Sequence, residues 1–251
     1  MIDFDERIIE LFANRAKDNY VDTINIGLGY TAVVLENGNC GVCCTLIDVK
    51  NSCTVYKINE DYENCCCLDL LHSLRINKDE ISRAVVIAMV NALSQSGDKP
   101  LTKDPNTLFE DLKLKKGDKM GMIGYFKPIV KDFQSKGVSV VAYDIGKEIG
   151  NEDSFYKSVN KEAQALIITA TSFINNTFGS IMEKIKTFDK PIAILGPSTI
   201  MEEKLYKDTG ISILGGTFVT NKEGVLKAIR NGKGTPHIHR HSDKVYSLLS
   251  Y

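Results

Sequence analysis

Residues 119–128, KMGMIGYFKP, carry the pattern that decides the fold. An apolar run ends at Gly124, a helix is expected over residues 128–135, and a second run, rich in valine, follows at 138–143. Runs of this kind, separated by segments of helix length, are typical of βαβ units and of a parallel sheet covered on both faces. Three further runs follow at 165–170, 191–195 and 211–214. The second part of the sequence therefore predicts an α/β domain built on a parallel sheet.

The chain before this region has a different pattern and predicts a smaller α+β domain. Its expected elements are a helix at 4–16, a hairpin turning at Asn37-Gly38 within 21–46, and helices at 66–75 and 78–93. Residues 94–100 are polar and contain a glycine and a proline, as is typical of a connection between domains. We therefore predict a boundary near Asp98, with the α+β domain over residues 1–97 and the α/β domain over 98–251.

Composition and charge narrow the class of protein. The 251 residues are 43% hydrophobic and 25% charged, which is ordinary for a globular protein of one large or two modest domains. The longest apolar run, 84–90, is far shorter than the roughly 18 residues of a membrane span, and the N-terminus is acidic, unlike a signal peptide. The net charge of -1 divides into -6 for residues 1–97 (8 basic, 14 acidic) and +5 for the rest (23 basic, 18 acidic). The basic excess is small and dispersed, so we expect a cytoplasmic protein without a nucleic-acid or membrane partner.

A first candidate site follows the first βαβ strand. Glycines such as Gly121 and Gly124 let the backbone approach a phosphate, and Asp144, 20 residues after Gly124, stands where an acidic residue binds the ribose of a dinucleotide. However, the GxxG pattern lacks the middle glycine of GxGxxG, and bulky Tyr125 and Phe126 occupy the turn. Nucleotide binding and an ordinary tight turn therefore both remain open.

Polar side chains follow two more predicted strands, in the segments 169–177 and 196–199. The carboxyl ends of parallel strands meet at one edge, which is where open α/β sheets bind ligands. Helix capping is the alternative, because serine, threonine and asparagine are favoured at helix starts. The residues that we expect to bind a ligand in these loops are Thr171, Ser172, Asn175, Ser198 and Thr199.

Three of the four histidines lie in the segment 236–241, PHIHRH. If this segment is extended, its imidazoles share one side and two of them, His237 and His239, can bind a metal ion. A helical conformation would separate them, and histidines near a chain end are also often simply solvated.

All seven cysteines lie between Cys40 and Cys67, and we interpret them as thiols rather than disulfides. On the returning strand of the hairpin, Cys40 and Cys44 share a face and Cys43 points to the other. Most are expected to be small buried side chains, although an exposed thiol among residues 65–67 could bind a soft metal. No motif of hydrolytic or phosphoryl-transfer enzymes is present, so the sequence names no reaction.

Three ordered motifs, at 120–128, 169–177 (TATSFINNT) and 195–199 (LGPST), resemble those of the family labelled "putative heavy-metal chelation". The resemblance implies a Rossmann-like C-terminal domain, preceded by a domain resembling the enolase N-terminal fold, whose opening hairpin is similar to residues 27–33 followed by Gly41. It also implies a ligand cleft between the domains, without the activity of enolase.

Three hypotheses follow from the sequence. The leading one is a protein that binds a small anionic metabolite, a metal or a metal chelate in the cleft, with a divalent or heavy metal ion as the expected cofactor. The alternative is an enzyme that depends on a nucleotide of the NAD or SAM type and uses Gly121, Gly124 and Asp144. The third, an interaction module with acidic and basic halves, leaves the polar loops unexplained.

Overall fold

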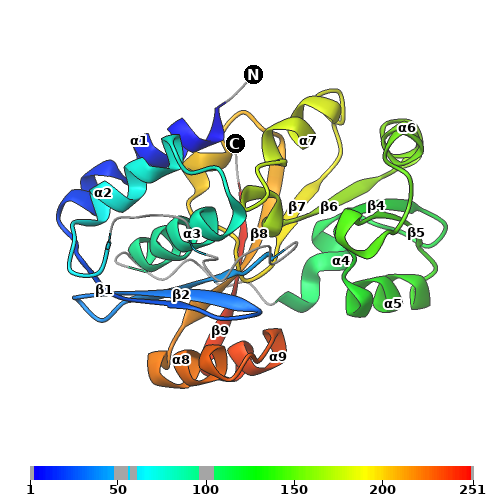
Figure 1. Ribbon diagram of the computed structural model, residues 1–251. Coiled ribbons are helices and arrows are strands. Elements are labelled where there is room, and N and C mark those ends of the chain that lie inside the picture. The colour runs from blue at the N-terminus through cyan, green and yellow to red at the C-terminus, as the bar shows by residue number, and fades with distance from the viewer. Residues whose placement is uncertain (1–2, 48–55, 57–60, 96–104, 250–251) are drawn as a thin grey trace.

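The structure is a computed structural model that describes residues 3–47, 56, 61–95 and 105–249. It contains a small antiparallel sheet and a larger, mostly parallel one, with helices around both (Figure 1). This arrangement confirms the predicted α/β class, with a mostly parallel sheet preceded by a smaller α+β part. The predicted boundary near Asp98 lies outside the described residues, so residues 3–95 are called the N-terminal part and 105–249 the C-terminal part.

The N-terminal part packs two helices and a short helix around a three-stranded sheet of order β1-β2-β3. Its elements are α1 (Phe4–Lys17), β1 (Val21–Ile26), β2 (Tyr30–Leu35), β3 (Cys40–Cys44), α2 (Cys67–His72), the 3-10 turn η1 (Ser73–Arg75) and α3 (Glu80–Ser94). The region 21–46, predicted as a two-stranded hairpin, contains three antiparallel strands, because the chain turns between β1 and β2 as well as between β2 and β3. Helix α3 lies so close to β3 that a Cβ on Gly41 would be 2.1 Å from the carbonyl oxygen of Ala88. Asn91 Nδ2 also donates to the Val42 carbonyl at 3.0 Å.

The C-terminal part contains a sheet of order β5-β4-β6-β7-β8-β9, in which β9 is antiparallel to β8 and the other neighbours are parallel. Its strands are β4 (Lys119–Ile123), β5 (Ser139–Tyr143), β6 (Ala165–Thr169), β7 (Ile192–Leu195), β8 (Ile211–Val219) and β9 (Ser242–Leu248). Its helices are α4 (Leu108–Asp111), α5 (Lys127–Ser135), α6 (Glu152–Glu162), α7 (Phe178–Lys184), α8 (Lys222–Arg230) and α9 (Thr235–Ile238). The five predicted strands are present, and β9 is an addition that the sequence did not indicate.

The direction in which the chain adds strands to the sheet reverses at β4. The chain passes from β4 outward to β5 and then returns across β4 to form β6 on its other side. The carboxyl ends of β4 and β6 therefore flank a topological switch point, the position where open α/β sheets bind their ligands. We call the turns that follow β4, β5 and β6 the switch-point edge.

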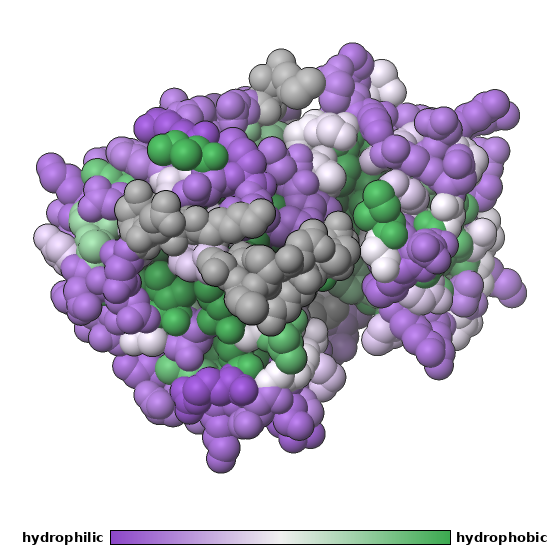
Figure 2. Space-filling model, in the orientation of Figure 1, coloured by the Kyte–Doolittle hydropathy of each residue, from purple (hydrophilic) through white to green (hydrophobic). Residues whose placement is uncertain are grey.

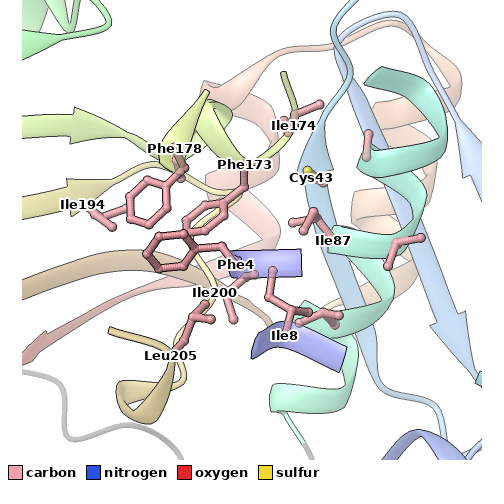
Figure 3. Packing of buried hydrophobic residues seen from close by; sticks show 14 of the residues in the cluster. Phe4, Ile8, Cys43, Ile87, Phe173, Ile174, Phe178, Ile194, Ile200 and Leu205 are labelled. Carbon is pink, nitrogen blue, oxygen red and sulfur yellow. The ribbon is translucent and has the colours of Figure 1, made fainter. Parts of the chain in front are cut away.

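The two parts share buried apolar packing. The Phe4 ring of α1 meets the Phe178 ring at 4.5 Å between centroids, and Phe173 lies beside both (Figure 3). On the opposite face of the small sheet, strands β2 and β3 pack against α8, with Val34 and Ile229 in one buried cluster. The small sheet therefore lies between α3 and a helix of the C-terminal part.

The face of the molecule in Figure 2 is mainly hydrophilic, and much of the apolar surface lies between raised polar regions. Among the described residues, no helix combines the length and the apolar character needed to cross a membrane.

Candidate functional site

The turn after β4 is fixed by Gly124. Its φ is +82°, and a Cβ there would lie 2.6 Å from Cβ of Thr169, so the position excludes larger residues. The backbone N–H of Gly124 donates to the Tyr143 carbonyl at 2.8 Å, and that of Tyr125 donates to Asp144 Oδ2, also at 2.8 Å. The structure therefore brings together three predicted residues, Gly124, Tyr125 and Asp144, at the switch-point edge.

Asp144 is paired with a lysine that the sequence did not single out. Lys147 Nζ donates to Asp144 Oδ2 at 2.8 Å and to the Tyr125 carbonyl at 3.1 Å. Burial raises the pKa of Asp144, but the hydrogen bonds from Lys147 and from the Tyr125 N–H outweigh it, so this pKa lies below its ordinary value. The Lys147 side chain is 55% exposed, whereas that of Asp144 is 13% exposed. The edge therefore presents an ammonium group to solvent.

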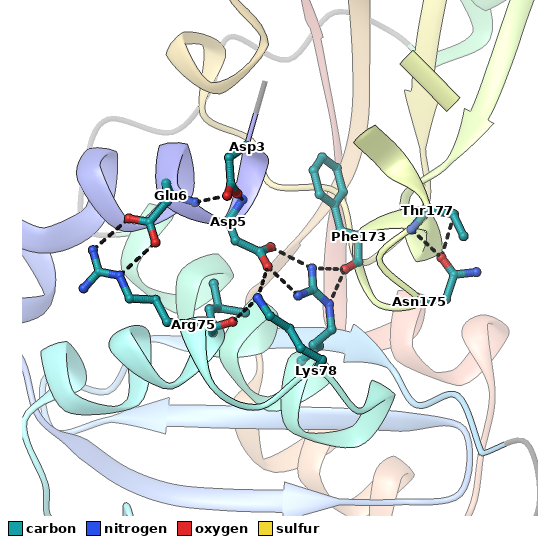
Figure 4. A network of polar contacts seen from close by, with 10 residues as sticks. Asp3, Asp5, Glu6, Arg75, Lys78, Phe173, Asn175 and Thr177 are labelled. Carbon is teal, nitrogen blue, oxygen red and sulfur yellow. Dashed lines mark hydrogen bonds and ion pairs between the residues drawn. The ribbon is translucent and has the colours of Figure 1, made fainter. Parts of the chain in front are cut away.

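The loop after β6 begins with the 3-10 turn η4 (Ala170–Phe173) and supplies one half-buried hydroxyl to this edge. Thr171 Oγ1 lies 2.9 Å from Thr169 Oγ1. Ser172 is buried and donates to the Thr169 carbonyl at 2.7 Å. Asn175 Oδ1 accepts from the Thr177 hydroxyl at 2.7 Å (Figure 4). The Thr171 side chain is thus partly open at this edge, while Ser172 and Asn175 use hydrogen bonds to hold the loop.

The loop after β7 connects the two parts. Ser198 is buried, and its Oγ accepts from the backbone N–H of Cys44 at 2.9 Å. Thr199 is also buried, and its hydroxyl lies 2.8 Å from the carbonyl oxygens of both Gly196 and Gly215. These two predicted residues hold the loop in place and tie it to β3.

Cys44, the last residue of β3, contacts the loop after β7 through the hydrogen bond from its backbone N–H to Ser198. Its thiol is half-buried; burial raises its pKa, and the Lys147 ammonium counteracts that rise. Cys40 belongs to the cluster under α8 and Cys43 to the cluster on the other face, as predicted from the strand periodicity, while Cys44 at the end of β3 packs against both clusters. All six cysteines in the described residues are free thiols, and Cys53 lies outside them.

Gly121 has a different role from the one predicted. It lies inside β4, where a Cβ would be 2.7 Å from Val159 Cγ2 and 2.9 Å from Leu166 Cδ1. The glycine allows α6 to pack closely on the sheet and is buried away from the edge.

The histidine segment is helical rather than extended, in α9 and the following 3-10 turn, His239–His241. His239 Nε2 lies 3.4 Å from Thr217 Oγ1, and the pKa of His239 is lowered by burial and by the Lys244 ammonium. The His241 ring lies instead against Gly224 of α8. The shared face on which we based metal binding by His237 and His239 is therefore not formed. In the described part of the chain, no three His, Cys, Asp or Glu side chains are grouped to hold a metal ion.

A buried charged network was missed by sequence reasoning. Arg83 of α3 is 1% exposed and donates to both carboxylate oxygens of Asp5 at 2.8 Å. It also donates from Nε and Nη2 to the Phe173 carbonyl, and Lys78 donates to Asp5 at 2.9 Å (Figure 4). An arginine among the mostly apolar residues 81–93 was the available sign. This network joins the loop after β6 to the N-terminal part.

The fold and the switch-point edge define a class of α/β protein in which a small antiparallel sheet, with its helices, packs beside a mostly parallel sheet. Within this class, the chain belongs to the family described as "Putative heavy-metal chelation", whose model matches residues 107–248. A second family model with the same description matches residues 9–94.

Two solved structures from the same family share this fold over nearly the whole chain. A protein of unknown function from Pyrococcus horikoshii has a TM-score of 0.79 and 22% identity, covering 98% of this chain and 100% of that chain. Another of unknown function, from Desulfitobacterium hafniense, has a TM-score of 0.74 and 14% identity, covering 97% and 99%. No curated protein matches the sequence.

Proposed function

We propose that this protein binds a small anionic metabolite that carries a metal ion, at the switch-point edge between the two parts. One observation carries the proposal: Asp144 and the Tyr125 carbonyl hold the Lys147 ammonium at this edge, with the lysine side chain 55% exposed. The half-buried Cys44 thiol of the N-terminal part lies within the electrostatic influence of this ammonium. An ammonium suits an anion, and a thiol suits a soft metal ion. The description of the family supports the same kind of ligand.

The anionic end of the ligand has two binding groups in this proposal. Lys147 is more than half exposed and supplies the charge, and the half-buried Thr171 hydroxyl supplies a hydrogen bond. Charge-assisted hydrogen bonds of this kind are about twice as strong as neutral ones. Asp144 fixes the position of the Lys147 ammonium.

The metal end is proposed to be held by Cys44 together with the anion itself. The thiolate is the form that binds metals, so the metal ion displaces the proton of a thiol whose pKa burial has raised. Since the described residues contain no group of three metal-binding side chains, the anion supplies the remaining ligands. This is why we propose a chelate rather than a bare ion, with a divalent or heavy metal ion as cargo.

The geometry favours this ligand over a nucleotide. Asp144, which would bind the ribose of a nucleotide, already accepts from the Tyr125 N–H, the Lys147 N–H and Lys147 Nζ. The proposal keeps the expected cytoplasmic location and the small-molecule or metal partner, without a nucleic-acid partner.

Thermal unfolding of the full chain tests the proposal with three probes: Cd²⁺, citrate, and the two together. A ligand that binds only the folded state raises its stability by about 2.7 kcal/mol at 100 times its Kd. We expect the mixture to stabilise the protein more than the two components separately. NAD and SAM serve as probes of the nucleotide alternative.

Two variants with matched controls assign the roles. Lys147→Gln is expected to reduce the effect of citrate, whereas Lys190→Gln, which removes another exposed ion pair, leaves it unchanged. Cys44→Ser is expected to reduce the effect of Cd²⁺. Cys65→Ser, which removes the alternative thiol that the sequence offered to a soft metal, is expected to leave it unchanged. If the mixture gives no added stabilisation, or if the controls respond equally, the proposal is wrong.

A further inference from the structure

The turn between β1 and β2, Gly27-Leu28-Gly29, presents a large apolar side chain to solvent. Leu28 is 79% exposed, and Ile26 at the end of β1 is 38% exposed. We call these residues, 26–29, the Leu28 tip. A single exposed apolar residue is ordinary by itself, so the surroundings of the tip decide what it can do.

The Leu28 tip rests on the carboxyl end of α8. A Cβ on Gly27 would lie 2.7 Å from Ile229 Cγ2, so only glycine allows this close approach. The Leu28 side chain lies beside the turn that follows α8, because its Cδ1 is 3.6 Å from the position that a Cβ on Gly232 would take. The packing against α8 therefore fixes the tip in place and leaves the leucine open to solvent.

Cations stand at the same end of α8. Lys227 and Arg230 belong to its last turn, three residues apart and hence on one side of the helix, and Lys233 follows Gly232. All three cations are exposed, and none forms an ion pair within the described part of the chain. The helix dipole favours cations in a last turn, which accounts for two of them but not for Lys233 or for the exposed Leu28.

The longer segment around α8 and α9 is basic as well. Residues 222–244 have a net charge of +4 (6 basic, 2 acidic), out of the +5 of residues 98–251. The basic excess that we expected to be dispersed is therefore concentrated in this segment. This concentration removes the reason for which we expected no membrane partner.

We propose that the Leu28 tip binds an anionic lipid surface, with Leu28 inserted below the lipid headgroups and the three cations in contact with them. Binding at such a surface grows with the apolar area that is inserted and with the attraction between cations and anionic lipids. A stable protein interface covers about 800 Å² on each partner, whereas the large apolar side chains exposed at the tip are Leu28 and Ile26. This inference does not depend on the ligand proposed for the switch-point edge.

Tryptophan fluorescence of the full chain tests the insertion. The sequence has no tryptophan, so Leu28→Trp places a single reporter at the tip. With vesicles of phosphatidylcholine and phosphatidylglycerol in equal parts, we expect the emission to shift to shorter wavelength, because the indole leaves water. Ile76→Trp is the matched control, since Ile76 is 81% exposed and lies between η1 and α3. No shift for Leu28→Trp, or an equal shift for Ile76→Trp, overturns the proposal.

Sedimentation with the same vesicles measures what each group contributes. Leu28→Ser is expected to weaken binding by about tenfold or more, and Lys233→Gln by about fivefold. Ile76→Ser and Lys131→Gln, which change an exposed apolar residue and an exposed lysine elsewhere, should leave binding unchanged. Binding should also be lost as the salt concentration is raised to about 1 M, where the Debye length is about 3 Å.

Two results would overturn the proposal at this stage. If vesicles of phosphatidylcholine alone bind the protein equally well, the cations have no part in binding. If Lys233→Gln weakens binding but Leu28→Ser does not, the segment attracts polyanions in general and the tip does not insert. Since both residues are exposed, thermal unfolding of the two variants should match that of the unchanged protein, which separates a loss of binding from a loss of folding.

Discussion

Two aspartate–cation pairs lie in two regions of the molecule. Their N···O distances are the same, but their surroundings differ. In the buried junction between the parts, Asp5 and Arg83 are 2.8 Å apart, with side chains 10% and 1% exposed. At the switch-point edge, Asp144 and Lys147 are also 2.8 Å apart, but the lysine is 55% exposed. The two aspartates are similarly buried, so the pairs differ in the exposure of the cation, and only the Lys147 ammonium is open to a ligand.

The type of cation fits each region. The planar guanidinium of Arg83 binds both oxygens of Asp5 and the Phe173 carbonyl at once, which leaves it fixed inside the junction. An ammonium such as that of Lys147 is a compact charge on a flexible stem, so it can turn toward an incoming anion. We infer that the junction pair holds the structure together and that the edge pair is the one available for binding.

The largest effect is expected from Arg83→Leu. This change leaves the carboxylate of Asp5 and the Phe173 carbonyl buried without their main partner, and breaking a buried pair in this way costs about 3–5 kcal/mol. Urea unfolding measures the loss. Arg75→Leu is the matched control, because the Arg75–Glu6 pair is 47% and 40% exposed and exposed ion pairs contribute little to stability. Equal losses in the two variants would contradict the structural role of the junction pair.

A smaller effect is expected from Gly124→Ala at the edge, about 1–3 kcal/mol. The added Cβ meets Thr169 at 2.6 Å and the backbone has a φ of +82°, so both packing and conformation are strained. Gly146→Ala, in the loop after β5, has no neighbour closer than 3.7 Å and no positive φ, and should be nearly neutral. Urea unfolding measures both variants. Equal losses of stability would mean that the backbone at Gly124 can adjust and is not fixed by its neighbours.

These two predictions also mark what the sequence could and could not indicate. The strand ends and the turn at Gly124 were predictable, because hydrophobic periodicity and glycine act locally. The contacts of Arg83 and Cys44 were not, because their partners Asp5 and Ser198 lie far from them along the chain. The histidine segment was assigned the wrong geometry, because Pro236 stands at the start of α9, a position that proline favours in helices.

Acid should weaken the junction more than the edge. Burial raises the pKa of Asp5, but hydrogen bonds and charges from Arg83 and Lys78 lower it below 3.8, and the pKa of Asp144 is lowered as well. A carboxyl group with a lowered pKa stabilises the fold above its unfolded-state pKa, and this contribution is lost as the pH falls through the folded-state value.

Unfolding free energies between pH 6 and pH 3 test this expectation. Stability should fall as the pH drops below about 4, near the ordinary aspartate pKa. Asp5→Asn should flatten this dependence more than Asp144→Asn does, because the cation that pairs with Asp5 is buried. If Asp144→Asn flattens it more, the ranking of the two pairs is reversed.

The smallest effect on stability is expected from Lys147→Gln, less than about 0.5 kcal/mol, because the pair is exposed on the lysine side.

The same variant is more informative about the reactivity of the Cys44 thiol. The Lys147 ammonium lowers the pKa of Cys44 against the rise caused by burial, so its removal should raise that pKa further and reduce the thiolate fraction. Alkylation of Cys44 by iodoacetamide, followed by mass spectrometry of its peptide, should slow by about two- to threefold, as expected for a partly screened charge. Cys65, which is also half-buried, serves as the reference within the same sample. An unchanged rate at Cys44 would mean that Lys147 does not influence this thiol, and the proposed role of Cys44 at the metal end of the ligand would lose its support.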